Sequence, residues 1–254
     1  MKNSAISCRR NPILCGVWSS RPYSRLSVSE HVEGWVGWNA MKQLMAEARR
    51  RLGRREEAFF TTLFLTGGRV SEVLRLKRGN FDIREDEGLI IVRGMPLLKR
   101  YRKVREVETA NGKRWITERL EKTRKPFPIV LSEPLTPILL KWLGKLKKPE
   151  ALLFPSSYRI GEPLSRFWAY NQVRRLDDTL PLTLKKRLGL NKPDMHLWLH
   201  WFRSQRASQL VEDYSFTVLD LIDWFSWEHE KTALDYARRG WRGLASKMKA
   251  AIYI

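Results

Sequence analysis

The sequence predicts a mainly α-helical α+β fold with a small antiparallel β-sheet at one edge. Apolar residues recur at helical spacing through most of the 254-residue chain. A strand pattern occurs near the middle, at residues 89–92, and a second apolar run contains Pro128, which restricts that run to the edge of a sheet. With 43% hydrophobic residues and 11 tryptophans, the chain can bury a sizeable core.

The first third of the chain is predicted to contain helices that glycines interrupt. Residues 1–37 carry Ser, Pro, Gly and scattered Trp without a sustained period, and we interpret them as an arm. A helix begins at Trp38 and has a basic last turn, and a second helix is interrupted by Gly67 and Gly68, after which helical spacing resumes. The expected helices are residues 38–51, 55–65 and 70–76.

The predicted sheet combines residues 89–92 with residues 127–131. The stretch between them is dense in Lys and Arg, and Asn111-Gly112 is typical of a hairpin turn. Helical spacing returns after the sheet, with one interruption at residues 177–194, which we expect to be a loop-rich, basic connection. The expected helices are residues 136–146, 165–176, 198–212 and 216–225.

The formal net charge of +21 is spread along the chain rather than held in one run. A folded protein with this excess is expected to bind a polyanion, and nucleic acid is the first candidate. A ribosomal or membrane-surface protein is the alternative that charge alone leaves open. No apolar run approaches the roughly 20 residues of a membrane span, so no membrane partner is expected.

The cysteines and histidines do not predict a metal site. Cys8 and Cys15 are the only cysteines, and the four histidines do not complete a zinc spacing with them. His196 and His200 are four residues apart, but neither a third ligand nor an HExxH-like base accompanies them. We therefore expect neither a metal nor another cofactor.

Two short segments carry residues suited to phosphodiester chemistry. Arg69 follows two glycines, which allow the backbone to approach a ligand closely, and Arg203 lies one helical turn after His200. An arginine guanidinium binds phosphate through two parallel hydrogen bonds and keeps its charge. Taken singly, these arginines could be surface charges and His200 a core residue, whereas Tyr236 could be an ordinary surface tyrosine.

Four groups of segments occur in a specific order along the chain. They are residues 66–76 with 81–83, 152–155 with 161–165, 200–203 with 207–210, and 225–227 nine residues before Tyr236. Each motif is weak alone, but in this order and spacing they resemble the tyrosine recombinases, the integrases of the phage and Xer type. The resemblance runs from about residue 38 to the C-terminus, so residues 38–254 are expected to form a tyrosine-recombinase catalytic domain and residues 1–37 an arm or a remnant of a core-binding domain.

The resemblance assigns a role to each candidate residue. It implies that Arg69, His200 and Arg203 contact the scissile phosphate and that Tyr236 forms a 3′-phosphotyrosine. Trp227 would fill a position that holds His or Trp in the family, and the nearby His229 is the alternative. No metal or nucleotide is implied.

The family also carries a lysine in a β-hairpin turn, where it acts as general acid toward the leaving 5′ oxygen. Several lysines compete for this role here. Lys99, which follows the first predicted strand, is our choice, while Lys103 and Lys122 are alternatives. Each of them could instead contact the DNA backbone without taking part in the chemistry.

The function implied is that of a site-specific recombinase or integrase of a mobile element such as a virus or plasmid. It would act on double-stranded DNA in the cytoplasm of the host cell, associated with the nucleoid, and self-assemble on DNA as a dimer or tetramer. Residues 241–254 would dock on a neighbouring subunit or cap their own core.

A type IB topoisomerase-like nicking-closing enzyme and a non-catalytic DNA-binding remnant are the alternatives to this function. The short arm suggests a catalytic domain alone, a split C-terminal fragment or a minimal variant.

Overall fold

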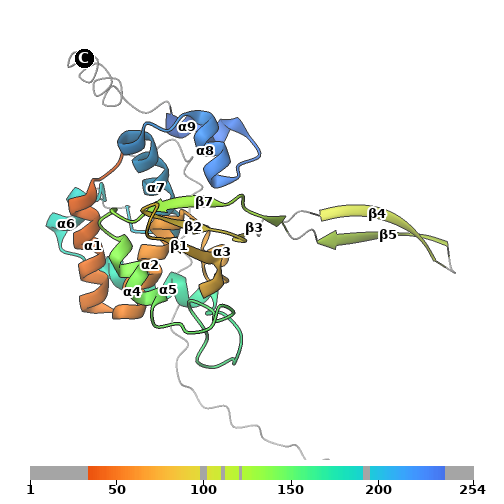
Figure 1. The fold of residues 1–254 in the computed structure, drawn as a ribbon, viewed down its shortest axis with the longest axis horizontal. Helices are drawn as coiled ribbons and strands as arrows, with labels where there is room; N and C mark the ends of the chain where they lie inside the picture. The colour runs from red at the N-terminus through yellow and green to blue at the C-terminus, as the bar shows by residue number, and fades with distance from the viewer. Residues whose placement is uncertain (1–33, 98–101, 110–111, 120–121, 191–194, 238–254) are drawn as a thin grey trace, which may run out of the picture. The chain divides into compact units, whose positions relative to one another are not determined.

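The computed structural model describes residues 34–97, 102–109, 112–119, 122–190 and 195–237. The chain divides into two units, residues 1–31 and residues 32–254, and the first lies outside the described residues. The predicted mainly helical α+β class with a small antiparallel sheet is confirmed (Figure 1). Several predicted features lie outside the described residues, namely most of the arm with Cys8 and Cys15, Lys99, Asn111 and the C-terminal docking segment.

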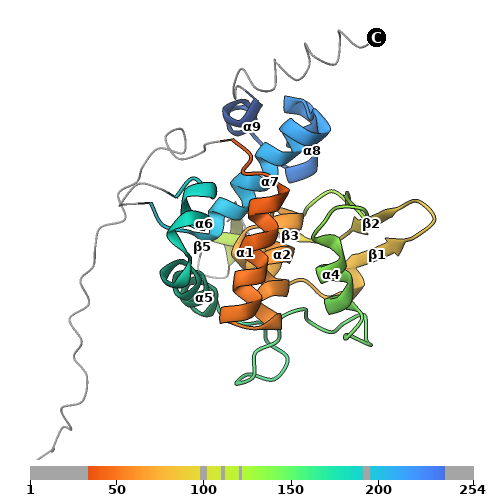
Figure 2. The same ribbon diagram turned by 90° about the vertical axis from the view of Figure 1, so that its left-hand side faces the viewer.

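The helix α2 (Arg54–Thr66) lies at the centre of the second unit, and all its residues from Glu56 to Thr66 are buried. It is apolar on most sides, as expected for a helix surrounded by protein. The helices α1 (Trp38–Arg51), α4 (Thr136–Leu143) and α7 (Leu199–Tyr214) pack against it (Figure 2). The ring of Phe60 in α2 stacks on the ring of Phe202 in α7 with 5.3 Å between centroids.

The main sheet has the strand order β1-β2-β7 and is antiparallel throughout, with β1 at Phe81–Arg84, β2 at Leu89–Val92 and β7 at Phe127–Val130. The predicted strands 89–92 and 127–131 correspond to β2 and β7. Pro128 lies in the edge strand β7, as its missing N–H requires. The strand β1 was not predicted, because only Phe81 and Ile83 in it are apolar.

The basic stretch between β2 and β7 is folded mainly into strand pairs. The short strands β3 (Pro96–Leu97) and β6 (Lys122–Thr123) pair with each other. Between them in the sequence lies a longer antiparallel ribbon, formed by β4 (Arg102–Thr109) and β5 (Gly112–Arg119). Thr109 lies opposite Gly112 in this ribbon, which agrees with the predicted hairpin.

The remaining helices follow the predicted order, with two additions, at residues 182–187 and 230–237. They are α3 (Val70–Val73), α5 (Arg166–Thr179), α6 (Leu182–Arg187), α8 (Val218–Phe225) and α9 (Glu230–Ala237). The prediction of a loop-rich connection at residues 177–194 is wrong where α6 forms. Leu184 and Leu188 are buried there, so contact with the core stabilises a helix that is too short to be recognised from its period. Among the described helices, none is long and apolar enough to cross a membrane.

Candidate active site

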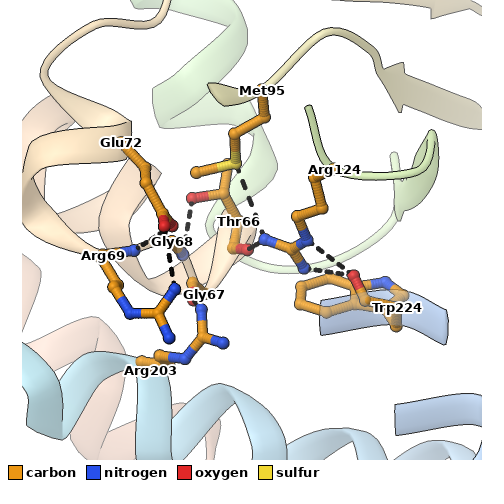
Figure 3. A network of polar contacts seen from close by, with 9 residues as sticks. All are labelled: Thr66, Gly67, Gly68, Arg69, Glu72, Met95, Arg124, Arg203 and Trp224. Atoms are coloured by element: carbon orange, nitrogen blue, oxygen red, sulfur yellow. Dashed lines mark hydrogen bonds and ion pairs between the residues drawn. The ribbon is translucent and has the colours of Figure 1, made fainter. Parts of the chain in front are cut away.

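The turn at the end of α2 brings the two predicted arginines together. Gly67 ends the helix in the left-handed conformation, with φ 53° and ψ 21°, which glycine adopts without strain. Its carbonyl oxygen accepts a hydrogen bond of 2.6 Å from Nη1 of Arg203 in α7. Arg69, two residues further along, begins α3 (Figure 3). The site therefore depends on a backbone turn that directs one arginine and accepts a hydrogen bond from the other.

A buried carboxylate orients Arg69. The backbone N–H of Arg69 donates to Oε2 of Glu72 at 2.8 Å, and its Nη1 donates to Oε1 of the same residue at 3.0 Å (Figure 3). The side chain of Glu72 is 1% exposed, whereas that of Arg69 is 40% exposed. The guanidinium is thus held at one edge while much of it faces solvent, where an anion can reach it.

Arg203 is buried, and part of its hydrogen-bonding capacity is unused. The residue is 2% exposed, and its Nη2 has no hydrogen-bond partner within the part of the chain that the structure describes. Its guanidinium lies 4.6 Å from the ring centroid of Phe225 and 5.5 Å from that of Trp227. Burial, and after it the charge of Arg69, lowers the pKa of Arg203 to about 10, so the group stays cationic at neutral pH.

His200 precedes Arg203 by one turn of α7. The residue is exposed at the start of the helix. Neighbouring protein groups nevertheless displace water from its ring and, together with the positive charges of Arg203 and Arg69, lower the pKa of His200 to about 4. The imidazole is therefore neutral at pH 7 and can donate or accept one proton in a hydrogen bond.

An aromatic stack joins the end of α8 to α9. Trp227 stacks on Phe225 with 4.5 Å between ring centroids and on Tyr236 with 5.5 Å between centroids. Ser226, in the left-handed conformation with φ 50°, reverses the chain between the first two rings. The structure thus brings Trp227 beside both Arg203 and Tyr236, whereas His229 is exposed in the segment before α9.

The hydroxyl of Tyr236 points into the protein. The residue is 2% exposed, and its hydroxyl lies 3.1 Å from Oγ of Ser204, which follows Arg203 in α7. The predicted surface alternative for Tyr236 is therefore wrong. The sequence does not reveal this burial, because a stretch of mixed polar residues surrounds Tyr236 along the chain.

The structure describes the three candidate lysines to different extents. Lys99 lies outside the described residues, and position 103 lies in β4 opposite Glu118. Lys122 is exposed in β6, and its Nζ lies 4.0 Å from Oε1 of Glu228 in the segment between Trp227 and α9.

Arg124 is a buried residue of this region that sequence reasoning missed. It is 2% exposed, and its Nη1 donates to the carbonyl oxygen of Thr66 while its Nε donates to that of Trp224, both at 2.7 Å (Figure 3). In a run of basic residues, nothing in the sequence separates a buried arginine from its exposed neighbours. The only local signal is the aromatic Phe127 three residues later, on which its guanidinium stacks.

The described side chains contain no group of three or more His, Cys, Asp and Glu residues that could hold a metal ion. His196, which was weighed as half of a zinc pair with His200, instead places its Nδ1 3.0 Å from Oδ2 of Asp177.

This arrangement of helices and sheet is that of the tyrosine-recombinase catalytic domain, and the predicted fold is confirmed by solved structures. The XerA recombinase aligns with a TM-score of 0.52 and 16% identity over 87% of this chain. The XerH site-specific recombinase bound to difH substrate aligns with a TM-score of 0.51 and 14% identity over 91% of this chain. The Tn1549 transposon integrase in complex with transposon right end DNA aligns with a TM-score of 0.55 and 14% identity over 89% of this chain.

This likeness establishes the fold. The alignments cover 66% of the XerA chain, 57% of the XerH chain and 67% of the Tn1549 integrase chain, so this chain spans about three fifths of the length of such proteins. No protein-family model matches the sequence, and no curated protein matches it either.

Proposed function

We propose that this chain cleaves and rejoins DNA through a 3′-phosphotyrosine intermediate, as a site-specific recombinase or integrase of a mobile element. One observation carries the proposal. Arg203 is buried, its Nη2 has no hydrogen-bond partner among the described residues, and it lies close to Arg69 and beside the aromatic stack that ends in Tyr236. A buried N–H without an acceptor destabilises the folded protein, and a phosphate oxygen would supply that acceptor.

Arg69 and Arg203 would bind the two nonbridging oxygens of the scissile phosphate. Both guanidinium groups are fixed by the protein before DNA arrives, Arg69 by Glu72 and Arg203 by the carbonyl of Gly67. Donors that are fixed in advance stabilise the charge that develops in the transition state without having to reorganise. His200, which is neutral at pH 7, would add a third hydrogen bond to the phosphate.

Tyr236 would attack the phosphorus through its phenol oxygen. In this step the tyrosine–phosphorus bond forms and the bond from phosphorus to the 5′ oxygen breaks. The phenol loses its proton, for which the neutral His200 is the candidate acceptor, and the 5′ oxygen gains a proton from a general acid. Rejoining is the reverse reaction with a 5′ hydroxyl of the same or another strand.

Lys122 is the candidate acid whose side chain the structure describes. The strand β6 that carries Lys122 lies beside the segment between Trp227 and α9, because Nζ of Lys122 is 4.0 Å from Oε1 of Glu228. Lys99, which is favoured by its place directly after the first predicted strand, stays a candidate, and so does Lys103. The structure does not describe the side-chain position of either residue.

The burial of the Tyr236 hydroxyl implies that the described arrangement is a closed state. A duplex phosphate cannot reach a hydroxyl that is enclosed beside Ser204. We therefore propose that DNA binding displaces α9, which has few residues and contacts only α7 and α8 extensively among the described elements. The partner would be double-stranded DNA in the nucleoid, and reciprocal exchange would require assembly of several copies on that DNA.

A suicide substrate tests the proposal. A duplex nicked next to the scissile phosphate traps the covalent intermediate, since the short leaving strand diffuses away before rejoining. We expect a protein–DNA adduct with the wild-type chain and none with Tyr236→Phe. An adduct without strand exchange between two duplexes would favour a topoisomerase-like activity, whereas DNA binding without any adduct would favour a non-catalytic remnant. An undiminished adduct in Tyr236→Phe would refute the assignment of the nucleophile.

A further inference from the structure

Arg124 lies where three segments of the candidate site meet. Its Nη1 donates to the carbonyl oxygen of Thr66 at 2.7 Å and contacts Sδ of Met95 at 3.6 Å, while its Nε donates to the carbonyl oxygen of Trp224 at 2.7 Å (Figure 3). Thr66 ends α2, Met95 precedes β3 and Trp224 belongs to the last turn of α8. One planar guanidinium thus connects three parts of the chain that are remote in sequence.

Two of the segments held by Arg124 lead to a candidate functional residue. Arg69 follows Thr66 by three residues, and Trp227 follows Trp224 by the same number. Arg124 itself comes two residues after Lys122, the candidate general acid. A shift of Arg124 would therefore change the position of Lys122 relative to the phosphate-binding turn.

Residues 122–125 make further contacts with residues 223–228, and we call this pair of segments the clasp. The backbone N–H of Lys125 donates to Oγ of Ser226 at 3.1 Å, and its Nζ lies 2.6 Å from Oδ1 of Asp223. Lys122 and Glu228 approach within 4.0 Å at the other end. Among these contacts those of Arg124 are the buried ones, so water competes with them least.

The chemistry of the Arg124 contacts requires arginine. The acceptors are two carbonyl oxygens and a thioether sulfur rather than a carboxylate, and the guanidinium plane lies 3.9 Å from the ring centroid of Phe127. Burial and the nearby charge of Arg203 lower the pKa of Arg124 well below its usual range. A lysine offers a point charge and cannot bond both carbonyls in one plane while stacking on the ring.

We infer that Arg124 is a positioning residue that holds Lys122 against the phosphate site, so that the leaving 5′ oxygen receives its proton. The inference rests on the proposed function. Arg124 acts through the clasp and does not itself touch the phosphate, since its donors are directed at Thr66 and Trp224. Its loss is expected to impair departure of the 5′ oxygen rather than attack by Tyr236.

A substrate whose leaving 5′ oxygen is replaced by sulfur separates these two steps, because a thiolate leaves without general-acid assistance. We expect Arg124→Lys and Arg124→Met to form adduct about 100-fold more slowly than wild type on the oxygen substrate, as general-acid catalysis contributes roughly 10²–10⁴-fold. On the sulfur substrate the rates should fall within about threefold of wild type. Lys122→Ala should show the same pattern, and combining it with Arg124→Lys should add little.

Arg206→Met is the matched control. Arg206 is also a buried arginine, 1% exposed, but among the described residues its guanidinium bonds Glu133 and Gln209 and approaches the clasp only through the ring of Trp224, 5.3 Å from the centroid. Any slowing in this variant should be equal on the two substrates. Thermal unfolding identifies variants that fail to fold, and Arg124→Lys provides the test if Arg124→Met does not fold.

The outcomes distinguish the inference from the function on which it rests. If folded Arg124→Lys is slowed equally on both substrates, or not slowed at all, the positioning role is refuted while the proposed function stands. If Lys99→Ala or Lys103→Ala is rescued by sulfur and Lys122→Ala is not, the link from Arg124 to Lys122 is refuted. If the wild-type chain forms no adduct on either substrate, the proposed function fails.

Discussion

The Nη1 atom of Arg203 donates to the carbonyl oxygen of Gly67 at 2.6 Å, although the two residues are 136 positions apart in the sequence. This hydrogen bond fixes α7 against the turn that follows α2. The same turn positions Arg69, so the distance between the two candidate phosphate-binding arginines depends on the conformation of Gly67. The consequences of this dependence can be measured.

We predict that Gly67→Ala destabilises the fold and disturbs the site. A Cβ atom at this position would lie 2.6 Å from Cε1 of Phe225 and 3.1 Å from Cζ3 of Trp224, and φ is +53°. The left-handed conformation costs roughly 1–2 kcal/mol for a residue with a Cβ, and overpacking adds about 1–3 kcal/mol. Urea unfolding should therefore show a loss of about 2–5 kcal/mol in the free energy of unfolding.

Gly88→Ala is the matched control for this prediction. Gly88 also has a positive φ, +68°, but a Cβ there would meet nothing within 4 Å. Its loss should be limited to the conformational term of about 1–2 kcal/mol. Equal losses in the two variants would show that contact of residue 67 with Phe225 and Trp224 does not constrain the turn.

The sequence predicted the helices that have an apolar period and the strands that are continuously apolar. It missed β1, α6 and α9, which are too short to show a clear period and are stabilised by a few buried side chains such as Phe81, Leu184 and Tyr236. Arg69, His200, Arg203 and Tyr236 were selected through the order of motifs that resemble those of the tyrosine recombinases, and their roles stay predictions. Arg124 could not be selected, because its importance lies in carbonyl partners 58 and 100 residues away.

The hydrogen bond between Ser204 and Tyr236 leads to a second prediction. Oγ and the phenol oxygen are 3.1 Å apart in a buried setting, where such a bond contributes about 1 kcal/mol. Ser204→Ala and Tyr236→Phe should each lower the free energy of unfolding, and a double-mutant cycle should give a coupling of about 0.5–1.5 kcal/mol.

The same pair separates structure from chemistry. Ser204→Ala should keep adduct formation on the suicide substrate, because the nucleophile is still present, whereas Tyr236→Phe should lose it. A coupling near zero would mean that the two hydroxyl groups do not interact in solution. Loss of the adduct in a folded Ser204→Ala variant would mean that Ser204 takes part in the reaction.

We predict that His200 makes the protein less stable in mild acid. The pKa of His200 is lowered from 6.5 to about 4 in the folded chain. Between these values the unfolded chain binds a proton that the folded chain does not, so stability falls as the pH drops from about 6.5 to about 4 and is unaffected by this group above pH 6.5. Because the residue retains solvent contact, we expect a loss of about 1 kcal/mol rather than the full value of the shift.

Thermal unfolding of wild type and His200→Gln at several pH values from 4 to 7 measures this effect. The carboxylates titrate in both proteins, so the difference between the two curves isolates His200. That difference should change across the pH range and become constant above about pH 6.5. A constant difference over the whole range would indicate that the pKa of His200 is the same in the folded and unfolded chains.

The unpartnered donor of Arg203 leads to the last prediction, which concerns DNA binding. If Arg203 neutralises one phosphate, Arg203→Met should make the slope of log K against log salt concentration less negative by about 0.9. It should also slow adduct formation by about 10²–10³-fold, as expected when a donor to the transition state is lost. Arg84→Met is the control, since Arg84 already pairs with Asp82 and Glu87 and should change the slope little. Equal changes of slope in the two variants would show that Arg203 makes no phosphate contact of its own and that the turn at Gly67 orients it for another purpose.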